Sequence, residues 1–339
     1  MKRFASVDAL RGVAVAAMIV VNTPGDWSHV YAPLLHSEWN GFTPTDLVFP
    51  LFLFIVGVSI SLAPSADARS MMLRALRIVA LGLALNLVAM WLIDGRGFRL
   101  WGVLQRIGIC YAAAGVLVIH AKPRTQWIVI VGLLLGYWAL MSLGGSFERE
   151  GNLASRVDTA LFGRFVYEYD AASGLGHDPE GLLSTIPAIA TTLLGVRAGD
   201  WLRSADLRRM VMSGVVALAL GAAWSLAFPI NKNLWTSSFV LWTAGWSLLA
   251  LAAFHLAVDR HGVPAFGRRF GINAIVIYAG AWVLECALDA TKLGGMIANA
   301  FSTVIADPRA ASLAYALAFA VSWWLVALVL DKRGVRSRI

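Results

Sequence analysis

The chain of 339 residues is too apolar for a soluble globular protein, since 59% of its residues are hydrophobic, 14% are charged and the mean hydropathy is +0.70. The formal net charge of +8 would suggest nucleic acid as a partner of a soluble protein. Here the basic residues collect in alternate connections between apolar segments, and the orientation of a membrane protein is a simpler account of that charge. The apolar segments lack the strict alternation of a membrane β-barrel, so the sequence predicts an all-α, polytopic membrane helix bundle.

The first predicted helix, 5–23, resembles a secretory signal because MKR precedes an apolar run. Asp8 and Arg11 interrupt that run, and NTPGDW follows it in place of a small-x-small cleavage site. We therefore expect a retained helix. Asp8 and Arg11 are three positions apart, so we expect them to pair on one face of that helix.

Nine further spans continue the pattern, and together they form one predicted domain, 1–339. Ten helices result if 292–309 does not cross the membrane. The span 182–199 is the most diluted, by Pro187, Gly195 and Arg197. The two cysteines lie in apolar segments without disulfide or metal-ligand spacing, so no metal is expected. These spans are 46–63, 73–93, 101–121, 126–143, 182–199, 210–229, 236–257, 271–288 and 311–330.

The positive charges predict the orientation. With the N-terminus inside, eighteen Lys and Arg residues fall at the inner ends and eight at the outer ends, while Arg11 and Arg106 lie within spans. We expect both termini in the cytoplasm and residues 24–45 outside. We expect an integral membrane protein of a bacterial inner membrane.

The longest predicted connection, 144–181, also lies outside and is expected to be non-helical. It holds seven acidic residues against three arginines, together with the turn signals GG, SG and LGHDPEG. A connection of this length either caps a substrate site or is a solvated linker, and the residues leave both open.

The segment HSEWNGFTPTDLVFP, 36–50, concentrates polar chemistry between two apolar spans. His36 is the natural proton acceptor near neutral pH, and Asp46 lies close enough to orient the imidazole if the loop folds back. Trp39 and Asn40 suit stacking on a sugar ring and hydrogen bonding to it. The alternative is an aromatic loop at the membrane surface.

Two further polar residues lie at or within the spans. Arg106 is costly inside a membrane and needs an anionic partner, for which Asp46, Glu285 or a ligand are candidates. Asn22 ends the first span, where an amide often serves only as an interhelical hydrogen-bonding group.

Several segments resemble the heparan-α-glucosaminide N-acetyltransferase family within the wider transmembrane acyltransferases. Together they extend from the first predicted helix to the ninth, so the resemblance covers nearly the whole chain. The segment 36–60 and the PINK-LWTSSF motif are its most specific parts. The matching segments are RFASVDALRG at 3–12, MIVVN at 18–22, HSEWNGFTPTDLVFPLFLFIVGVSI at 36–60, GVLQRIGICY at 102–111, PINKNLWTSSFVL at 229–241 and, more weakly, GINAIVIY at 271–278.

The resemblance implies transfer of an acetyl group from cytoplasmic acetyl-CoA to an amino-sugar on the far side of the membrane. It assigns the active-site histidine of the H-x-x-W-N-G motif to His36 and the asparagine that ends the first helix to Asn22. Lysosomal members carry an extra non-cytoplasmic domain before the shared helices, and the present chain is expected to be the membrane core alone. That difference puts a long polymeric acceptor in doubt.

The resemblance and the charge pattern together suggest roles for the basic residues. Arg11, Arg74, Arg77 and Arg197 are candidates for the CoA phosphates at the inner mouth, although the positive-inside rule accounts for each of them equally. His36 would take a proton from the acceptor amine, or carry the acyl group in a ping-pong route, while Asn22 would stabilise the oxyanion. Lys232, Trp235 and Arg106 would shape the sugar site or hold the helices together.

Two other functions remain open from the sequence. Charged groups within spans and helices broken by Pro or Gly also suit a transporter of sugar-like solutes, although no internal repeat is visible. An O-acyltransferase acting on a cell-envelope glycan or lipid would use the same histidine on a hydroxyl group. Membrane lipids are expected partners in each case, and a homo-oligomer is left open.

Overall fold

The computed structural model describes residues 4–63, 67–149 and 151–336, and nearly all of its secondary structure is helical. The α-helices are α1 (Ala5–Asn22), α2 (Val48–Leu62), α3 (Ala68–Leu92), α4 (Val103–His120), α5 (Pro123–Leu143), α6 (Leu153–Phe162), α7 (Leu182–Arg203), α8 (Leu207–Trp224), α9 (Ser237–Phe254), α10 (Arg268–Ile272), α11 (Ala274–Ala290), α12 (Leu293–Val304) and α13 (Pro308–Lys332). Shorter elements are the 3₁₀ turns η1 (Ala32–Leu34), η2 (Pro44–Leu47) and η3 (Gly163–Phe165), the π-helical turn η4 (His255–Arg260) and the strands β1 (Glu168–Asp170) and β2 (Leu175–His177).

The all-α polytopic bundle predicted from composition is confirmed. Within the described residues, nine helices are long and apolar enough to cross a membrane, and the bent pair α11–α12 raises that number to ten if it forms one span. Every predicted span coincides with a helix to within a few residues. The predicted pair inside the first helix is also confirmed, because Arg11 Nη1 lies 3.3 Å from Asp8 Oδ1.

The prediction that 144–181 is non-helical is wrong, because the segment forms a small folded cap containing α6, η3 and the β1–β2 hairpin. Asn152 begins α6 by accepting a hydrogen bond from the Ser155 amide at 2.8 Å. The two strands pair antiparallel, with Glu168 opposite His177. The residues left a cap and a solvated linker open, and Asp158 accepts a hydrogen bond from the Leu182 amide, which ties the segment to the start of α7.

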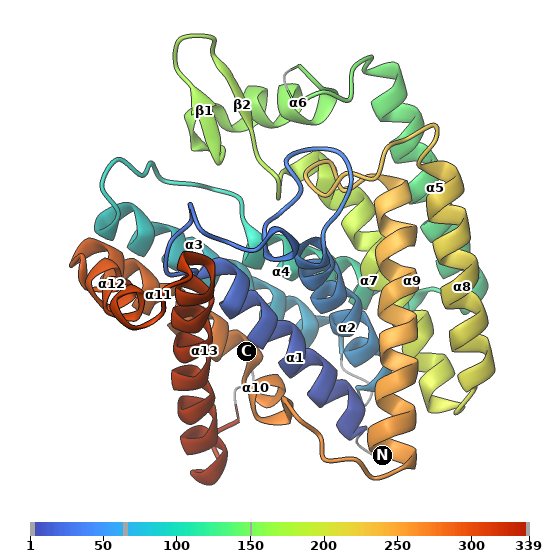
Figure 1. The fold of residues 1–339 in the computed structure, drawn as a ribbon. Coiled ribbons are helices and arrows are strands. Elements are labelled where there is room, and N and C mark those ends of the chain that lie inside the picture. Colours follow the sequence, from blue (N-terminus) through green and yellow to red (C-terminus); the bar gives the residue numbers. More distant parts are fainter. Residues whose placement is uncertain (1–3, 64–66, 150, 337–339) are drawn as a thin grey trace.

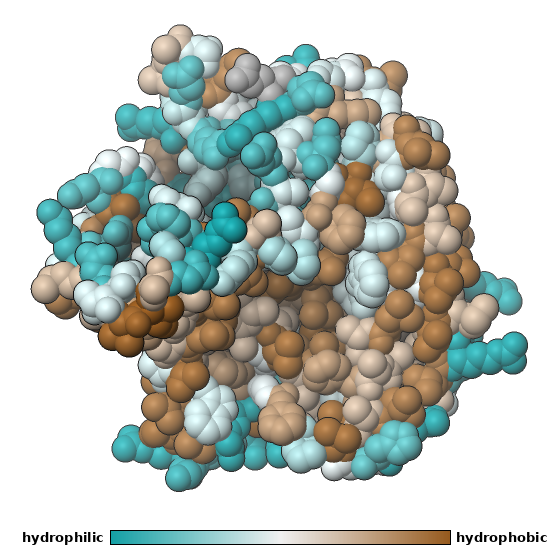
Figure 2. All heavy atoms as spheres, viewed as in Figure 1, coloured by the Kyte–Doolittle hydropathy of each residue, from teal (hydrophilic) through white to brown (hydrophobic). Residues whose placement is uncertain are grey.

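The cap lies over one end of the bundle. In Figure 1 the hairpin and α6 stand above the helices, while α1 begins and α13 ends at the opposite side. Figure 2 shows apolar residues along the sides of the bundle and hydrophilic residues gathered over the cap and along the lower edge. This distribution is the one expected for a bundle whose sides face lipid. We call the capped end the outer end and the opposite end the inner end.

The helices at the centre of the bundle approach closely through glycine. A Cβ atom added at Gly195 of α7 would lie 2.0 Å from the Phe54 carbonyl oxygen of α2, and one added at Gly57 of α2 would lie 1.8 Å from the Thr192 carbonyl oxygen of α7. Gly195 and Gly199 form a small-xxx-small spacing that lets two backbones meet. This close pairing fixes α2, and with it the loop that carries the polar segment 36–46.

Candidate functional site

His36 and Asp46 come together at the outer end of α2, as the sequence suggested. Thr43 and Asp46 form a capping box at the start of η2, with the Thr43 amide donating to Asp46 Oδ2 at 3.0 Å. The Ser37 amide donates to the same oxygen at 3.0 Å, which folds the loop back. The other oxygen, Asp46 Oδ1, lies 2.7 Å from His36 Nδ1. A neutral His36 that donates from Nδ1 to this buried carboxylate carries its lone pair on Nε2.

Lys232 completes this cluster from the loop between α8 and α9. Its Nζ lies 2.9 Å from His36 Nδ1, 3.2 Å from His36 Nε2 and 3.4 Å from Asp46 Oδ1. Burial lowers the pKa of Lys232 below its ordinary value, although the neighbouring Asp46 and Glu180 act in the opposite direction. The cluster thus holds an imidazole, a carboxylate and a desolvated amine within hydrogen-bond distance of one another.

Contacts between two loops fix the position of Lys232. The Asn231 side chain accepts a hydrogen bond from the Leu234 amide at 2.8 Å and donates to the Asn40 side chain at 3.2 Å. The Gly41 amide donates to the Ile230 carbonyl at 2.7 Å. Lys232 is therefore held by the loop that presents His36, and its side chain is only 15% exposed.

Two adjacent cavities lie around the cluster. An outer cavity of about 450 Å³ opens beneath the cap, and a deeper one of about 120 Å³ continues between the ends of α1, α2 and α4. The amide group of Asn22 makes no hydrogen bond within the described part of the chain, and it faces this shared space. Six residues line both cavities: Asn22, His36, Val103, Glu180, Lys232 and Tyr278.

The cap contributes a charged wall to the outer cavity. Arg99, from the connection between α3 and α4, donates to both Asp178 and Glu180, and its guanidinium stacks on the Tyr167 ring at 4.6 Å. Burial would raise the pKa of Glu180, but Arg99 and Arg106 outweigh it and hold that pKa below its ordinary value. Sequence reasoning missed Glu180 and Arg99, and the acidic bias of 144–181 was a signal for Glu180 alone.

Arg106 is fully buried, and its partners differ from those expected. Its guanidinium donates to the Ser184 hydroxyl and, at 3.3 Å, to the Gly181 carbonyl, both at the start of α7. It also lies 4.9 Å from the Trp235 ring centre. The prediction of Asp46 or Glu285 as its direct partner is wrong, because Arg106 points toward α7 and the cap. Arg106 therefore couples α4 to the base of the cap.

Three residues predicted to bind the sugar contact protein groups instead of the outer cavity. Trp39 donates from Nε1 to the Phe147 carbonyl at 2.9 Å and packs edge-on against His177. Asn40 accepts the hydrogen bond from Asn231 described above. Trp235 is 1% exposed and donates to Thr191. The structure therefore places Trp39, Asn40 and Trp235 in the framework that holds the loops.

A second large cavity, of about 610 Å³, opens at the inner end of the bundle. Arg11 and Arg74 line it, as the sequence suggested for the inner mouth. Arg77 is absent from its lining, and Arg197 pairs with Asp200 at 2.7 Å outside it. Arg203, at the end of α7, lines this cavity and was not singled out from the sequence.

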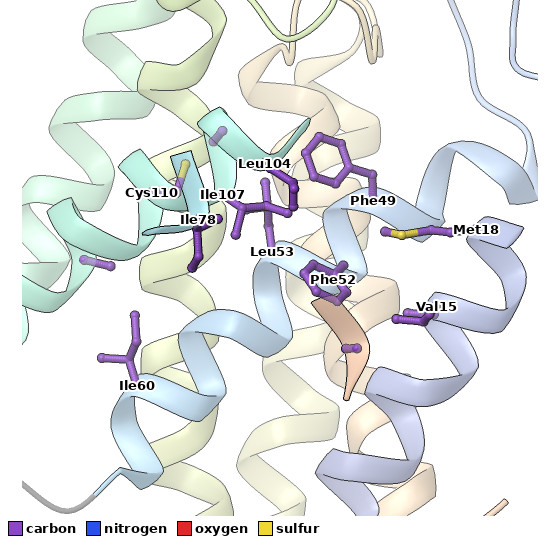
Figure 3. Packing of buried hydrophobic residues seen from close by; sticks show 14 of the residues in the cluster. Val15, Met18, Phe49, Phe52, Leu53, Ile60, Ile78, Leu104, Ile107 and Cys110 are labelled. Carbon is purple, nitrogen blue, oxygen red and sulfur yellow. The ribbon is translucent and has the colours of Figure 1, made fainter. Parts of the chain in front are cut away.

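The inner and outer cavities are separated by a thin apolar layer. Figure 3 shows the buried apolar cluster in this region, to which Met18 of α1, Phe52 of α2, Ile78 of α3 and Ile107 of α4 contribute. On four helices, a residue lining the outer or the deeper cavity lies three or four positions from one lining the inner cavity: Phe49 and Phe52 on α2, Gly82 and Ile78 on α3, Leu104 and Ile107 on α4, and Tyr278 and Ile275 on α11. That spacing corresponds to about one helical turn, or about 5 Å.

The sequence is similar to those of known proteins. The sequence model of the family described as "Heparan-alpha-glucosaminide N-acetyltransferase, catalytic" matches residues 3–228, which carry His36, Asp46, Asn22 and the cap. The chain is 29% identical over 355 aligned positions to proteins named heparan-alpha-glucosaminide N-acetyltransferase from Homo sapiens and Mus musculus. The alignments cover 84% of this chain but 53% and 54% of the relatives, so the chain spans about half their length. The chain belongs to the heparan-alpha-glucosaminide N-acetyltransferase catalytic family.

Proposed function

We propose that this protein transfers an acetyl group from cytoplasmic acetyl-CoA to the amine of a glucosamine-type sugar on the outer side of the membrane. One observation carries the proposal. His36, paired with the buried carboxylate of Asp46, faces an outer cavity, and about one helical turn separates that space from an arginine-lined inner cavity. The membership in an N-acetyltransferase family supports the reaction type.

The inner cavity suits the donor. Arg11, Arg74 and Arg203 provide guanidinium groups for the CoA phosphates, which such groups bind well. The apolar layer beyond them suits the acyl-bearing pantetheine arm, which is narrow and carries no charge. The arm would pass between Phe52, Ile78 and Ile107 and bring its thioester into the deeper cavity beside His36. Arg77 and Arg197 lie outside this route.

In the proposed mechanism His36 acts as general base. Asp46 accepts a hydrogen bond from Nδ1–H, so Nε2 takes the proton of the acceptor nitrogen as that nitrogen attacks the thioester carbonyl. The Asn22 amide, which lines the same cavity, donates to the developing oxyanion, a contribution of a few kcal/mol in comparable sites. The ping-pong route, in which His36 Nε2 carries the acyl group, uses the same geometry.

The acceptor would enter from the capped end. Glu180 stays ionised beside the outer cavity and offers a carboxylate to a protonated amino-sugar. Lys232 and Arg99 offer donors to sugar hydroxyl groups, while Arg106 supports the wall from behind. A hydroxyl acceptor on an envelope glycan or lipid would fit the same base, which keeps O-acylation as the alternative within this reaction class.

A transporter of sugar-like solutes is the second candidate. Two cavities that approach each other from opposite ends across a thin apolar layer also resemble an alternating-access pathway. The two functions differ in what happens to acetyl-CoA. Transport leaves the thioester intact, whereas transfer releases one CoA thiol for each acetylated acceptor.

The deciding experiment measures thiol release from acetyl-CoA by the purified protein against a panel of amino-sugars and their hydroxyl analogues. We expect release that depends on glucosamine and falls at least about 100-fold in His36→Ala. His29→Ala is the matched control, because His29 also faces an aspartate, with Nδ1 2.7 Å from Asp26 Oδ2, but lies outside the outer cavity. Full activity in His36→Ala, or uptake of glucosamine without thiol release, would overturn the proposal.

A further inference from the structure

The amine of Lys232 lies against the imidazole that would deprotonate an acceptor nitrogen. Its Nζ lies 2.9 Å from His36 Nδ1 and 3.2 Å from His36 Nε2, the proposed base atom. The acceptor nitrogen has to reach hydrogen-bond distance of that same atom before its proton can be removed. Lys232 is thus an amine already placed beside the catalytic base.

The thioester would arrive within reach of this amine. Lys232, His36 and Asn22 all line the deeper cavity, the one nearest the apolar layer. Since this cavity measures about 120 Å³, a thioester in it has few positions remote from the Lys232 side chain. An acetyl carbonyl bound to the Asn22 amide would therefore face both the sugar nitrogen and Lys232.

Two features distinguish Lys232 from an ordinary surface lysine. Its loop is fixed, because Asn231 binds both Leu234 and Asn40, and Trp235 continues the loop with a φ of 50° while its side chain is buried. Its surroundings are desolvated, and burial lowers the pKa of its ammonium group, which increases the fraction present as the nucleophilic free amine.

We propose that Lys232 is a self-acetylation site: when no acceptor is bound, its Nζ attacks the acetyl thioester held beside His36 and becomes Nζ-acetyllysine. The new bond joins Nζ to the acetyl carbonyl carbon, and the carbon–sulfur bond breaks. CoA leaves as the thiolate, and the proton lost by Nζ passes through His36 to that sulfur. One acetyl-CoA yields one acetyllysine and one CoA thiol.

The modification would silence the site. An amide is too stable to pass its acetyl group to a sugar, so acetyl-Lys232 is a product and not a carrier. It also removes the positive charge beside Asp46 and places a neutral acetamide against the His36 ring that the acceptor nitrogen has to reach. Acceptor and Lys232 therefore compete for one thioester, and a shortage of acceptor would switch the enzyme off.

The inference rests on the proposed function, and the test separates the two. The purified full-length protein is incubated with acetyl-CoA, with and without glucosamine, and acetylation at each lysine is measured by peptide mass spectrometry. The other lysines, Lys2, Lys122, Lys292 and Lys332, report non-enzymatic acetylation; Lys292 is exposed and serves as the matched site. We expect Lys232 to exceed Lys292 by at least about tenfold because its amine is held at the base.

Three further results are expected. Glucosamine protects Lys232, His36→Ala reduces its acetylation to the level of Lys292, and Lys232→Arg shows none at position 232 while Lys292→Arg leaves Lys232 acetylation unchanged. Transfer to glucosamine, together with Lys232 no more acetylated than Lys292 in the sample without glucosamine, overturns this inference alone, as does Lys232 acetylation that His36→Ala leaves unchanged. Acetylated Lys232 without transfer to any amino-sugar overturns the proposed acceptor alone. Absence of both reactions overturns both proposals.

Discussion

At the scale of single residues, sequence distance decided what was predictable. His36 and Asp46 are ten positions apart, so a loop that folds back brings them together, and the sequence predicted the pair. Lys232 lies 196 positions from His36, and no local pattern indicates that its amine reaches the imidazole. Glu180 and Arg99 were missed for the same reason, since their contact depends on how the cap packs against the connection between α3 and α4.

The first prediction concerns Asp46. In Asp46→Asn the side chain keeps its volume but loses the charge that holds the proton on His36 Nδ1, so the wrong tautomer of His36 becomes accessible. We expect kcat for thiol release to fall by about 10²- to 10⁴-fold with little change in KM for acetyl-CoA. Steady-state kinetics measure both values. Asp26→Asn, which alters the exposed His29 pair, should retain activity within about twofold, and equal losses in both variants would contradict the role of Asp46.

The second prediction concerns Asp158 in the cap. Burial raises the pKa of this carboxyl group to about 6, although the Leu182 amide that donates to it acts in the opposite direction. The folded protein therefore holds this proton more tightly than the unfolded chain. The protonated Asp158 side chain therefore contributes roughly 3 kcal/mol to the free energy of unfolding below about pH 4. This contribution is lost as the pH rises through 6.

Comparison with Asp158→Asn isolates this effect. As the pH rises from 4 to 7, we expect the thermal unfolding midpoint of the wild type to fall relative to that of Asp158→Asn. Tryptophan fluorescence in detergent measures both midpoints. Burial lowers the pKa of His177, so this residue makes stability increase with pH below about pH 6.5. Because His177 is present in both proteins, its effect cancels in the comparison. A difference independent of pH would show that Asp158 does not titrate in this range.

At the scale of secondary structure, the hydrophobic pattern was sufficient for the spans and insufficient for the cap and α12. Long apolar runs have no alternative to helix in a membrane, so the spans followed from composition. The cap is held by specific contacts, such as Asn152 beginning α6 and Asp158 binding Leu182, and its composition resembles that of a linker. The chain bends by 85° between α11 and α12, at Thr291 and Lys292. Lys292 has the left-handed backbone conformation there (φ 59°), which a lysine residue rarely adopts.

The third prediction concerns the contact between α2 and α7. In Gly195→Leu the new side chain meets the backbone of Phe54, which cannot move without displacing α2 and the His36 loop. We expect the free energy of unfolding to fall by about 1–3 kcal/mol, which lowers the unfolding midpoint, and thiol release to fall as well. Gly132→Leu on α5 is the control, because a Cβ added at Gly132 meets no atom within 4 Å. Equal midpoints for the two variants would contradict the close helix contact.

At the scale of the whole molecule, charge predicted the orientation but not the cavities. Counting basic residues assigns sides to the connections without any knowledge of packing. The inner cavity and the outer cavity exist because side chains from several helices fail to fill the space, and neither is visible in a linear pattern. The arginines show this limit: Arg11, Arg74, Arg77 and Arg197 were equivalent in the sequence, yet two line the inner cavity and two do not.

The fourth prediction tests the orientation on which acetyl transfer across the membrane depends. Both native cysteines, Cys110 and Cys286, are buried, so background labelling by a thiol reagent should be low. Ser173 is exposed in the turn of the cap hairpin, and Ser204 is exposed where α7 ends at the opposite side of the bundle. Ser173→Cys and Ser204→Cys therefore place one reactive thiol at each end.

In intact spheroplasts, a membrane-impermeant maleimide should label Ser173→Cys at once and Ser204→Cys only after the membrane is permeabilised. The two variants control for each other, because each must label fully in the permeabilised sample for its accessibility to count. The reverse pattern would place His36 and the cap in the cytoplasm, where acetyl-CoA needs no passage through the bundle. The thin apolar layer between the two cavities would then have no role in transfer.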